Sequence, residues 1–224
     1  MDFTKFPEKV TLMMSGGLDS TILAALLIKE NIQFNGIYID YGQMNARNSR
    51  RILNRLTRSH NIPLEIISIP TLADSFIGNM DEEYDEYAVM LCEVDEGPLS
   101  FTPITTLAAS LAASMGSDAL ILGYNKTDRD ADEDRYQYTQ LVNRHIEEMM
   151  SAPRKKPFKI LTPFWDTAKG DIVELGLASD WDVNDTWSCW DNKPFHCGVC
   201  PGCIDRKDGF AESKIDDPTT YSAQ

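Results

Sequence analysis

The sequence predicts an α/β fold, in which helices cover both faces of a parallel β-sheet. Over the first two-thirds of the 224 residues, short apolar runs alternate with longer helical segments, which is the order of elements in such folds. A serine- and glycine-rich turn follows the first apolar run, and four cysteines gather in the last 36 residues. We therefore expect a Rossmann-like α/β domain over residues 1–180. A small metal-binding segment over residues 181–224 is expected to pack on it.

The predicted strands are short apolar runs bounded by residues that end a strand. Pro70 closes the third run and Gly123 follows the fourth, and both residue types interrupt strands. Runs of this length suit strands that are buried on both faces. The predicted strands are Val10–Met14, Phe34–Ile39, Leu64–Ile69 and Ala119–Leu122.

The segments between these runs predict the helices. The first and third are rich in Ala, Leu or Ile, which suits helices that pack against a sheet. Asn45 directly precedes the second and is a residue type that caps helix N-termini. The predicted helices are Ser20–Glu30, Ala46–His60, Leu107–Met115 and one from about Asp134 to Met150.

Three polar segments follow predicted strands. They are Ser15–Ser20, Asp40–Gln43 and Tyr124–Asp128. In parallel sheets the carboxyl ends of the strands share one edge, and ligands bind beyond that edge. The sequence therefore predicts one site to which all three segments contribute.

The first of these segments has the chemistry of a phosphate-binding loop. Two glycines allow backbone amides to approach an anion closely, and the positive end of the following helix points at the same place. Hydroxyl and carboxylate side chains add donors and a ligand for a metal ion. The loop lacks the final lysine of the Gly-Lys-Ser/Thr nucleotide loop, and it suits the pyrophosphate that leaves when ATP is cleaved between its α- and β-phosphates. Its residues are Ser15, Gly16, Gly17, Leu18, Asp19, Ser20 and Thr21.

Charge and composition limit the classes of molecule that the protein is expected to bind. The net charge of −14 disfavours broad electrostatic binding of nucleic acid. Eight carboxylates between Asp81 and Glu96 predict a solvated acidic excursion. The basic triplet Arg154–Lys156 predicts a solvated loop. The chain has no apolar run of membrane-spanning length and no signal-peptide pattern at its N-terminus, so we expect a cytoplasmic protein without a membrane partner.

The four clustered cysteines predict a metal site. Cys189, Cys197, Cys200 and Cys203 follow the spacing Cys-x7-Cys-x2-Cys-x2-Cys. Four thiolates at such spacing favour a structural Zn²⁺ ion, with an iron–sulfur cluster as the alternative. His196 is expected to lie outside the ligand set, and the fifth cysteine, Cys92, is expected to be a separate thiol.

The phosphate loop resembles the signature of the N-type ATP pyrophosphatases, enzymes that adenylate an oxygen with ATP and let a nucleophile displace AMP. Four further features narrow the match: the segment Asp40–Gln43, Thr127-Asp128 four residues after Gly123, Thr162-Pro163 before Lys169, and the four-cysteine tail. Together they resemble the 7-cyano-7-deazaguanine synthases, over about residues 10–209. That family has the adenine nucleotide α-hydrolase type of Rossmann-like fold and converts 7-carboxy-7-deazaguanine, ammonia and ATP to a nitrile.

The resemblance implies roles for the site residues. The loop residues Ser15 to Thr21 hold the ATP phosphates together with Mg²⁺, and Asp19 and Lys169 are the implied catalytic residues. Lys169 supplies the cation that charged phosphates require. A homodimer is also implied. The implied substrate pocket is formed by Tyr41, Gln43, Thr127 and Asp128.

One segment departs from the family pattern. After the acidic stretch the family reads approximately Phe-Val-Pro-Gly-Arg-Asn, whereas here the chain reads Phe101-Thr102-Pro103-Ile104-Thr105-Thr106. A guanidinium is lost, and Arg129 and Arg135 are the candidates to replace its charge. Three alternatives therefore stay open: an enzyme that stops at the amide, a ligase or tRNA thiolase with another acceptor, and an ATP-binding paralogue without turnover.

Overall fold

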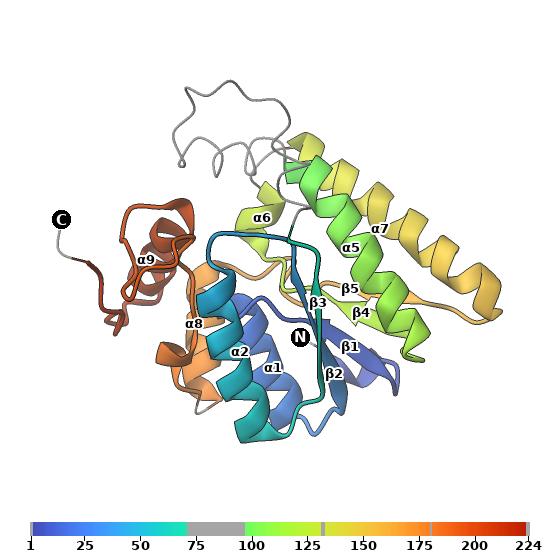
Figure 1. Cartoon of the computed structure of the whole chain (residues 1–224), viewed down its shortest axis with the longest axis horizontal. Helices are drawn as coiled ribbons and strands as arrows, with labels where there is room; N and C mark the ends of the chain where they lie inside the picture. Colours follow the sequence, from blue (N-terminus) through green and yellow to red (C-terminus); the bar gives the residue numbers. More distant parts are fainter. Residues whose placement is uncertain (1, 71–96, 131–132, 180, 223–224) are drawn as a thin grey trace.

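The fold is a five-stranded parallel sheet with helices on both of its faces (Figure 1). The computed structural model of the chain describes residues 2–70, 97–130, 133–179 and 181–222. The α/β class and the parallel sheet that the sequence predicts are confirmed. The strands are β1 (Val10–Met13), β2 (Phe34–Asp40), β3 (Leu64–Ser68), β4 (Ala119–Ile121) and β5 (Lys159–Leu161).

The strand order β3-β2-β1-β4-β5 places β1 at the centre of the sheet. Val10 of β1 pairs with Phe34 of β2 on one side and with Ala119 of β4 on the other. The order along the chain therefore reverses between β1 and β4. Ligand sites of open α/β sheets lie beyond the carboxyl ends of the strands at such a reversal.

The helices form two layers because the strands present alternate side chains to opposite faces. Ala119 and Ile121 of β4 are buried in the layer that contains α1, α2 and α8, and Leu120 is buried in the layer that contains α5 and α7. The helices are α1 (Leu18–Lys29), α2 (Ala46–His60), α5 (Gly97–Ser114), α6 (Lys126–Asp130), α7 (Glu133–Arg154), α8 (Lys169–Ala178) and α9 (Pro201–Ser213), with 3-10 turns at Phe3–Lys5 and Val183–Asp185.

The predicted elements are present, but several of their ends differ. α1 begins at Leu18 rather than Ser20, so its N-terminus lies inside the predicted phosphate loop. α5 begins at Gly97, well before the predicted start at Leu107, and contains Pro103. α7 continues to Arg154, which is therefore helical rather than part of a loop. The acidic stretch 81–96, which includes Cys92, lies outside the described residues.

Asn45 precedes α2 as predicted, but its side chain does not cap the helix. Its Nδ2 donates instead to the backbone oxygen of Cys189, at 3.2 Å. The prediction of a side-chain cap was therefore wrong, because a partner 144 residues away competes for the amide. Asn45 thus joins the start of α2 to the cysteine cluster.

Four of the strands and α-helices were not predicted: β5, α6, α8 and α9. β5 has only three residues, which is too short for an alternating pattern. α8 and α9 each contain two glycines, which weaken a helical signal. Gly170 and Gly209 have a packing role, because α8 and α9 lie against each other. A Cβ on Gly170 would come within 2.7 Å of the Glu212 side chain, and one on Gly209 within 2.5 Å of the Lys169 side chain.

Gly209→Ala is expected to lower stability by about 1–3 kcal/mol, because the added methyl overpacks the contact between α8 and α9. The melting temperature of the protein should fall by a few degrees, as measured by thermal unfolding. Asp208→Ala, at an exposed position of the same helix, is the matched control and should leave it unchanged. Equal melting temperatures for the two variants would contradict the close contact.

Among the described residues, no helix combines the length and the apolar character that crossing a membrane requires.

Candidate functional site

The predicted phosphate loop connects the central strand β1 to α1. Gly16 has a φ of +78°, a left-handed conformation, and a Cβ at this position would come within 3.2 Å of the Ser49 backbone oxygen. The loop is also held from the C-terminal part of the chain, because the N–H of Trp187 donates to the Gly16 oxygen at 2.8 Å. Ser15 Oγ and Ser20 Oγ lie 3.1 Å apart. The geometry is a tight turn at a helix N-terminus, as an anion-binding loop requires.

Lys169 lies at the start of α8 and is almost fully buried, with 6 % of its surface exposed. Its Nζ donates to Asp19 Oδ2 at 2.8 Å and forms a second ion pair with Asp205. Burial lowers the pKa of Lys169, but the two carboxylates outweigh it and raise the pKa above its ordinary value. The ammonium is therefore held as a permanent cation beside the loop, which is not how a surface lysine at a helix end behaves.

Asp205 was missed by sequence reasoning. It lies on α9, two residues after Cys203, and nothing in its local sequence relates it to Lys169. The contact arises because α9 packs on α8. The helix that begins at the cysteine cluster therefore carries one of the two carboxylates that hold the Lys169 ammonium.

Asp128 lies in the segment after β4, as predicted. Its Oδ2 accepts from the N–H of Asn125 at 2.9 Å, while Asn125 Oδ1 accepts from the N–H of Thr127 at 2.7 Å. Surrounding protein atoms and the charge of Asp19 raise the pKa of Asp128 to about 6, although the residue itself is exposed to solvent. Asp19, Asp128 and Lys169 thus interact electrostatically at one edge of the sheet.

The segment after β2 is organised by its own side chains. Gln43 Oε1 accepts from the N–H of Tyr41 at 2.9 Å, and its Nε2 donates to the Tyr38 hydroxyl at 2.8 Å. Asp40 accepts from the N–H of Gly42 and pairs with Arg50. The Gln43 amide is therefore engaged in shaping the turn that displays Tyr41.

The segment that departs from the family pattern lies within α5. Ile104 is buried against the sheet, and Thr105 is buried beside the hydroxyl of Tyr124. Arg129, predicted as a replacement for the lost guanidinium, pairs with Asp130 and Asp166. The Arg135 side chain lies outside the described residues. The helix thus contributes packing where the family pattern has a Gly-Arg-Asn sequence.

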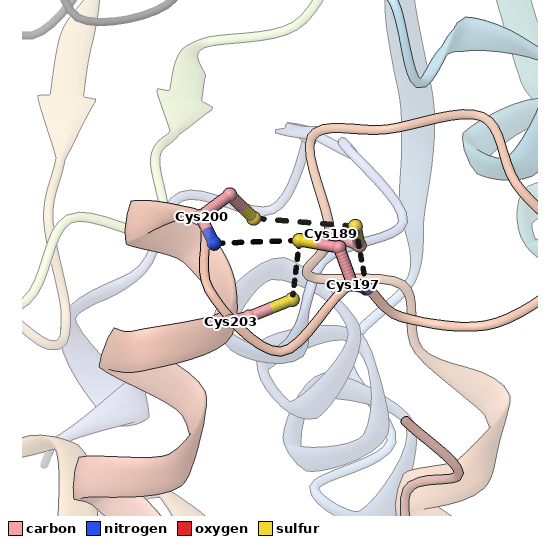
Figure 2. Close-up of side chains that lie close together, drawn as sticks. All are labelled: Cys189, Cys197, Cys200 and Cys203. Atoms are coloured by element: carbon pink, nitrogen blue, oxygen red, sulfur yellow. Dashed lines mark hydrogen bonds between the residues drawn. The ribbon is translucent and has the colours of Figure 1, made fainter. Parts of the chain in front are cut away.

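The four predicted cysteines converge (Figure 2). Their sulfur atoms all lie within 4.8 Å of one another, with Cys197 and Cys203 at 3.9 Å and Cys189 and Cys200 at 4.0 Å. Four sulfurs at 2.3 Å from one Zn²⁺ ion would stand about 3.8 Å apart. Backbone N–H groups also point at the sulfurs, such as that of Cys197 at Cys189 Sγ. The cluster therefore has the size and the donors of a single-metal site.

His196 precedes Cys197 and is not part of the group of four cysteines that could hold a metal. Its Nε2 accepts from the N–H of Ser188 at 3.2 Å, and its ring packs on Trp187. Burial, with the nearby charge of Arg206, lowers the pKa of His196 to about 4, so the ring is neutral at pH 7. That His196 lies outside the ligand set stays a prediction, and Trp187 packs around the cluster as a buried residue.

Comparisons with known proteins agree with this geometry. The family model for "Queuosine biosynthesis protein QueC" matches residues 9–214. The chain is 28% identical over 213 residues to 7-cyano-7-deazaguanine synthase 1 of Sulfurisphaera tokodaii, covering 95% of this chain and 98% of that protein. It is 29% identical over 224 residues to 7-cyano-7-deazaguanine synthase of Methanothrix thermoacetophila, covering 93% and 96%.

Solved structures agree on the fold. NMN synthetase from Francisella tularensis matches with a TM-score of 0.54 and 16% identity, over 94% of this chain and 79% of that one. NH3-dependent NAD synthetase from Campylobacter jejuni matches with a TM-score of 0.50 and 18% identity, over 80% and 66%. With the family match over nearly its full length, the chain belongs to the QueC family of queuosine biosynthesis proteins and is an ATP-dependent enzyme of the ligase type.

Proposed function

We propose that the protein converts 7-carboxy-7-deazaguanine, ammonia and ATP to 7-cyano-7-deazaguanine, the product named by its relatives. The observation that carries the proposal is the buried Lys169 ammonium beside Asp19, at the start of α1 and at the sheet edge. A fixed cation next to an anion-binding loop suits a reaction that releases pyrophosphate.

The reaction requires ATP to activate the substrate twice, first at the carboxylate and then at the amide. A carboxylate oxygen attacks the α-phosphorus of ATP and pyrophosphate leaves, which turns an oxide leaving group into AMP. Ammonia then attacks the acyl carbon, AMP leaves, a proton is lost and an amide results. A second adenylation on the amide oxygen allows AMP to leave again, with loss of two N–H protons, and gives the nitrile. Both adenylations place negative charge on phosphate oxygens, and Lys169 is the candidate to stabilise it.

The loop also fits a divalent cation. Asp19 Oδ2 is held by Lys169, while Asp19 Oδ1 is buried and has no hydrogen-bond partner among the described residues. An unpartnered buried carboxylate oxygen is the kind of ligand that Mg²⁺ prefers. We therefore assign Asp19 as its ligand, and when bound the ion would neutralise phosphate charge. The amides and hydroxyls of Ser15 to Thr21 would hold the phosphates themselves.

The proposed acceptor pocket lies between the segments after β2 and β4. Tyr41 offers a ring, and the Asp128 carboxylate can accept from the N–H edge of a guanine-like base. Gln43 supports this pocket by holding the turn rather than by direct contact with the base. Its amide oxygen already accepts from the Tyr41 N–H, and its amide nitrogen donates to the Tyr38 hydroxyl. The backbone N–H of Thr127 donates to Asn125 Oδ1 and so holds the Asn125 side chain in place.

Binding of the acceptor base should strengthen as the pH rises through about 6. The reason is that Asp128 titrates with a pKa of about 6, and only its ionised form accepts two N–H bonds. Affinities measured by calorimetry between pH 5 and 7.5 would test this, with Asp128→Asn as the comparison. The variant should bind weakly and show a flat profile over this range. The same pH dependence in Asp128→Asn would assign the titration to another group.

We propose Zn²⁺ as the metal of the cysteine cluster. The sulfur separations near 4 Å match four ligands around one ion, whereas an iron–sulfur cluster sets its cysteine sulfurs further apart because each binds a different iron. The division into residues 1–180 and 181–224 and the homodimer also stay proposals. Light scattering of the purified protein would test the dimer.

The direct test is to follow AMP and the base by mass spectrometry after mixing metal-loaded protein with Mg-ATP, ammonium and 7-carboxy-7-deazaguanine. Nitrile with AMP is the expected result. 7-Deazaguanine, which lacks the carboxylate, is the control and should give no AMP. Amide alone would indicate an enzyme that stops halfway, and the Ile104–Thr106 segment would be the first suspect. ATP binding without AMP would overturn the proposal and favour another acceptor or a paralogue without turnover.

A further inference from the structure

Five of the 21 basic residues lie on α2, and they share one side of that helix. The positions 47, 50, 51, 55 and 58 are separated by three, one, four and three residues, which brings them onto one helical face. The opposite face, with Ile52, Leu53 and Leu56, is buried in the core. The helix contains no acidic residue, and all five of its charged side chains are arginines: Arg47, Arg50, Arg51, Arg55 and Arg58.

These arginines line an open hollow of about 880 Å³, together with Asp40, Asn54 and Ser59. Arg50 pairs with Asp40 and Arg55 pairs with Asp185. Arg51 lies over the Trp187 ring, 5.8 Å from its centre. In the described part of the chain no ion pair forms at Arg47 or Arg58. Two carboxylates thus face five guanidinium groups, which leaves a local positive surplus on a chain whose net charge is −14.

A second hollow, of about 340 Å³, adjoins the first and shares Arg51 and Arg55 with it. Trp187 and His196 are buried in its wall, and Phe195 stands 52 % exposed at its edge. Thr219 and Thr220 add hydroxyl groups. The exposed Phe195 ring thus lines the same hollow as the Arg51 and Arg55 guanidinium groups. This combination suits an unstacked base with its phosphates, since aromatic rings stack on bases and arginine forks bind phosphate.

We propose that this arginine face of α2, with the adjoining Phe195 pocket, binds a single-stranded nucleic acid. The residues from Arg47 to Arg58 span about 16 Å along the helix axis, which is enough for a few successive phosphates. All five of these α2 residues are arginines and none is a lysine, which suits bidentate contact with phosphate. The function is separate from the proposed reaction, whose substrate is a free base. An acidic protein segment would meet the same charges but would not use the Phe195 ring in the same way.

The test is binding of a fluorescent single-stranded RNA of about a dozen nucleotides, followed by anisotropy between about 50 and 200 mM salt. For three or four phosphate contacts, the slope of log K against log salt should be about −2 to −3. The double variant Arg47→Gln, Arg58→Gln should bind at least tenfold more weakly, with a shallower slope. The double variant Arg154→Gln, Lys156→Gln is the matched control, because it removes two positive charges that pair with Asp118 elsewhere. It should bind like the unaltered protein.

Phe195→Ala should weaken binding about tenfold without changing the slope, because stacking is independent of salt. The unaltered protein failing to bind RNA at about 50 mM salt would overturn the proposal, as would equal losses in the two double variants. Displacement of the RNA by polyglutamate as effectively as by unlabelled RNA would also overturn it and would favour an acidic protein partner. Melting temperatures would confirm that each variant is folded.

Discussion

Lys169→Met is expected to lower ATP turnover by about 10²- to 10³-fold, the loss typical when one preorganised donor to a charged transition state is removed. Lys169 is buried and its ammonium is held by Asp19 and Asp205. Methionine keeps most of the length and apolar volume of the side chain but carries no charge. Pyrophosphate release in a single turnover, measured separately from ATP binding, would show whether the chemical step is affected.

Two further variants make this test specific. Lys169→Arg keeps the charge but changes the shape of the head group, so it should recover only part of the activity. Asp205→Asn removes one of two charged partners and should lower turnover less, by about tenfold, as expected for one charge-assisted hydrogen bond. Turnover of Lys169→Met within threefold of the unaltered enzyme would exclude Lys169 as the stabilising cation.

Cys203→Ser is expected to release the bound metal and abolish ATP turnover. Structural zinc contributes about 10–16 kcal/mol in zinc-finger peptides at pH 7, comparable with the whole folding free energy of a domain. Cys203 lies in the first turn of α9, the helix that carries Asp205 to Lys169. Losing the metal should therefore unfold this segment and disturb the ATP site, although the sulfur atoms of the four clustered cysteines form no hydrogen bond with the phosphate loop.

Elemental analysis would measure the metal, with about one zinc per chain as the expected result. Cys92→Ser is the control, because Cys92 lies outside the Cys-x7-Cys-x2-Cys-x2-Cys motif of the sequence; this variant should keep the metal and the activity. Iron with acid-labile sulfide in the purified protein would overturn the zinc assignment. A metal-free Cys203→Ser protein with full turnover would show that α9 holds Asp205 in place without the metal.

The sequence was most informative where the chemistry is local. The phosphate loop and the parallel strands were predicted from runs of a few residues, because backbone turns and burial patterns are set by neighbours along the chain. The four cysteines were predicted as one cluster for the same reason, since Cys-x2-Cys spacing brings thiolates together over a single turn. The ends of α5 and α7 were predicted poorly, because tertiary packing overrides local preference there.

The sequence by itself determined the α/β class, the glycine-rich turn before α1 and the cysteine cluster, whereas the tertiary structure alone decided which distant residues lie beside them. Asp19 and Lys169 are 150 residues apart, and Asp205 joins them only because α9 packs on α8. The five arginines of α2 are visible in the sequence, but the place of Arg51 and Arg55 beside Trp187 and Phe195 is not. Such contacts depend on how helices pack, and no local pattern encodes packing between distant segments.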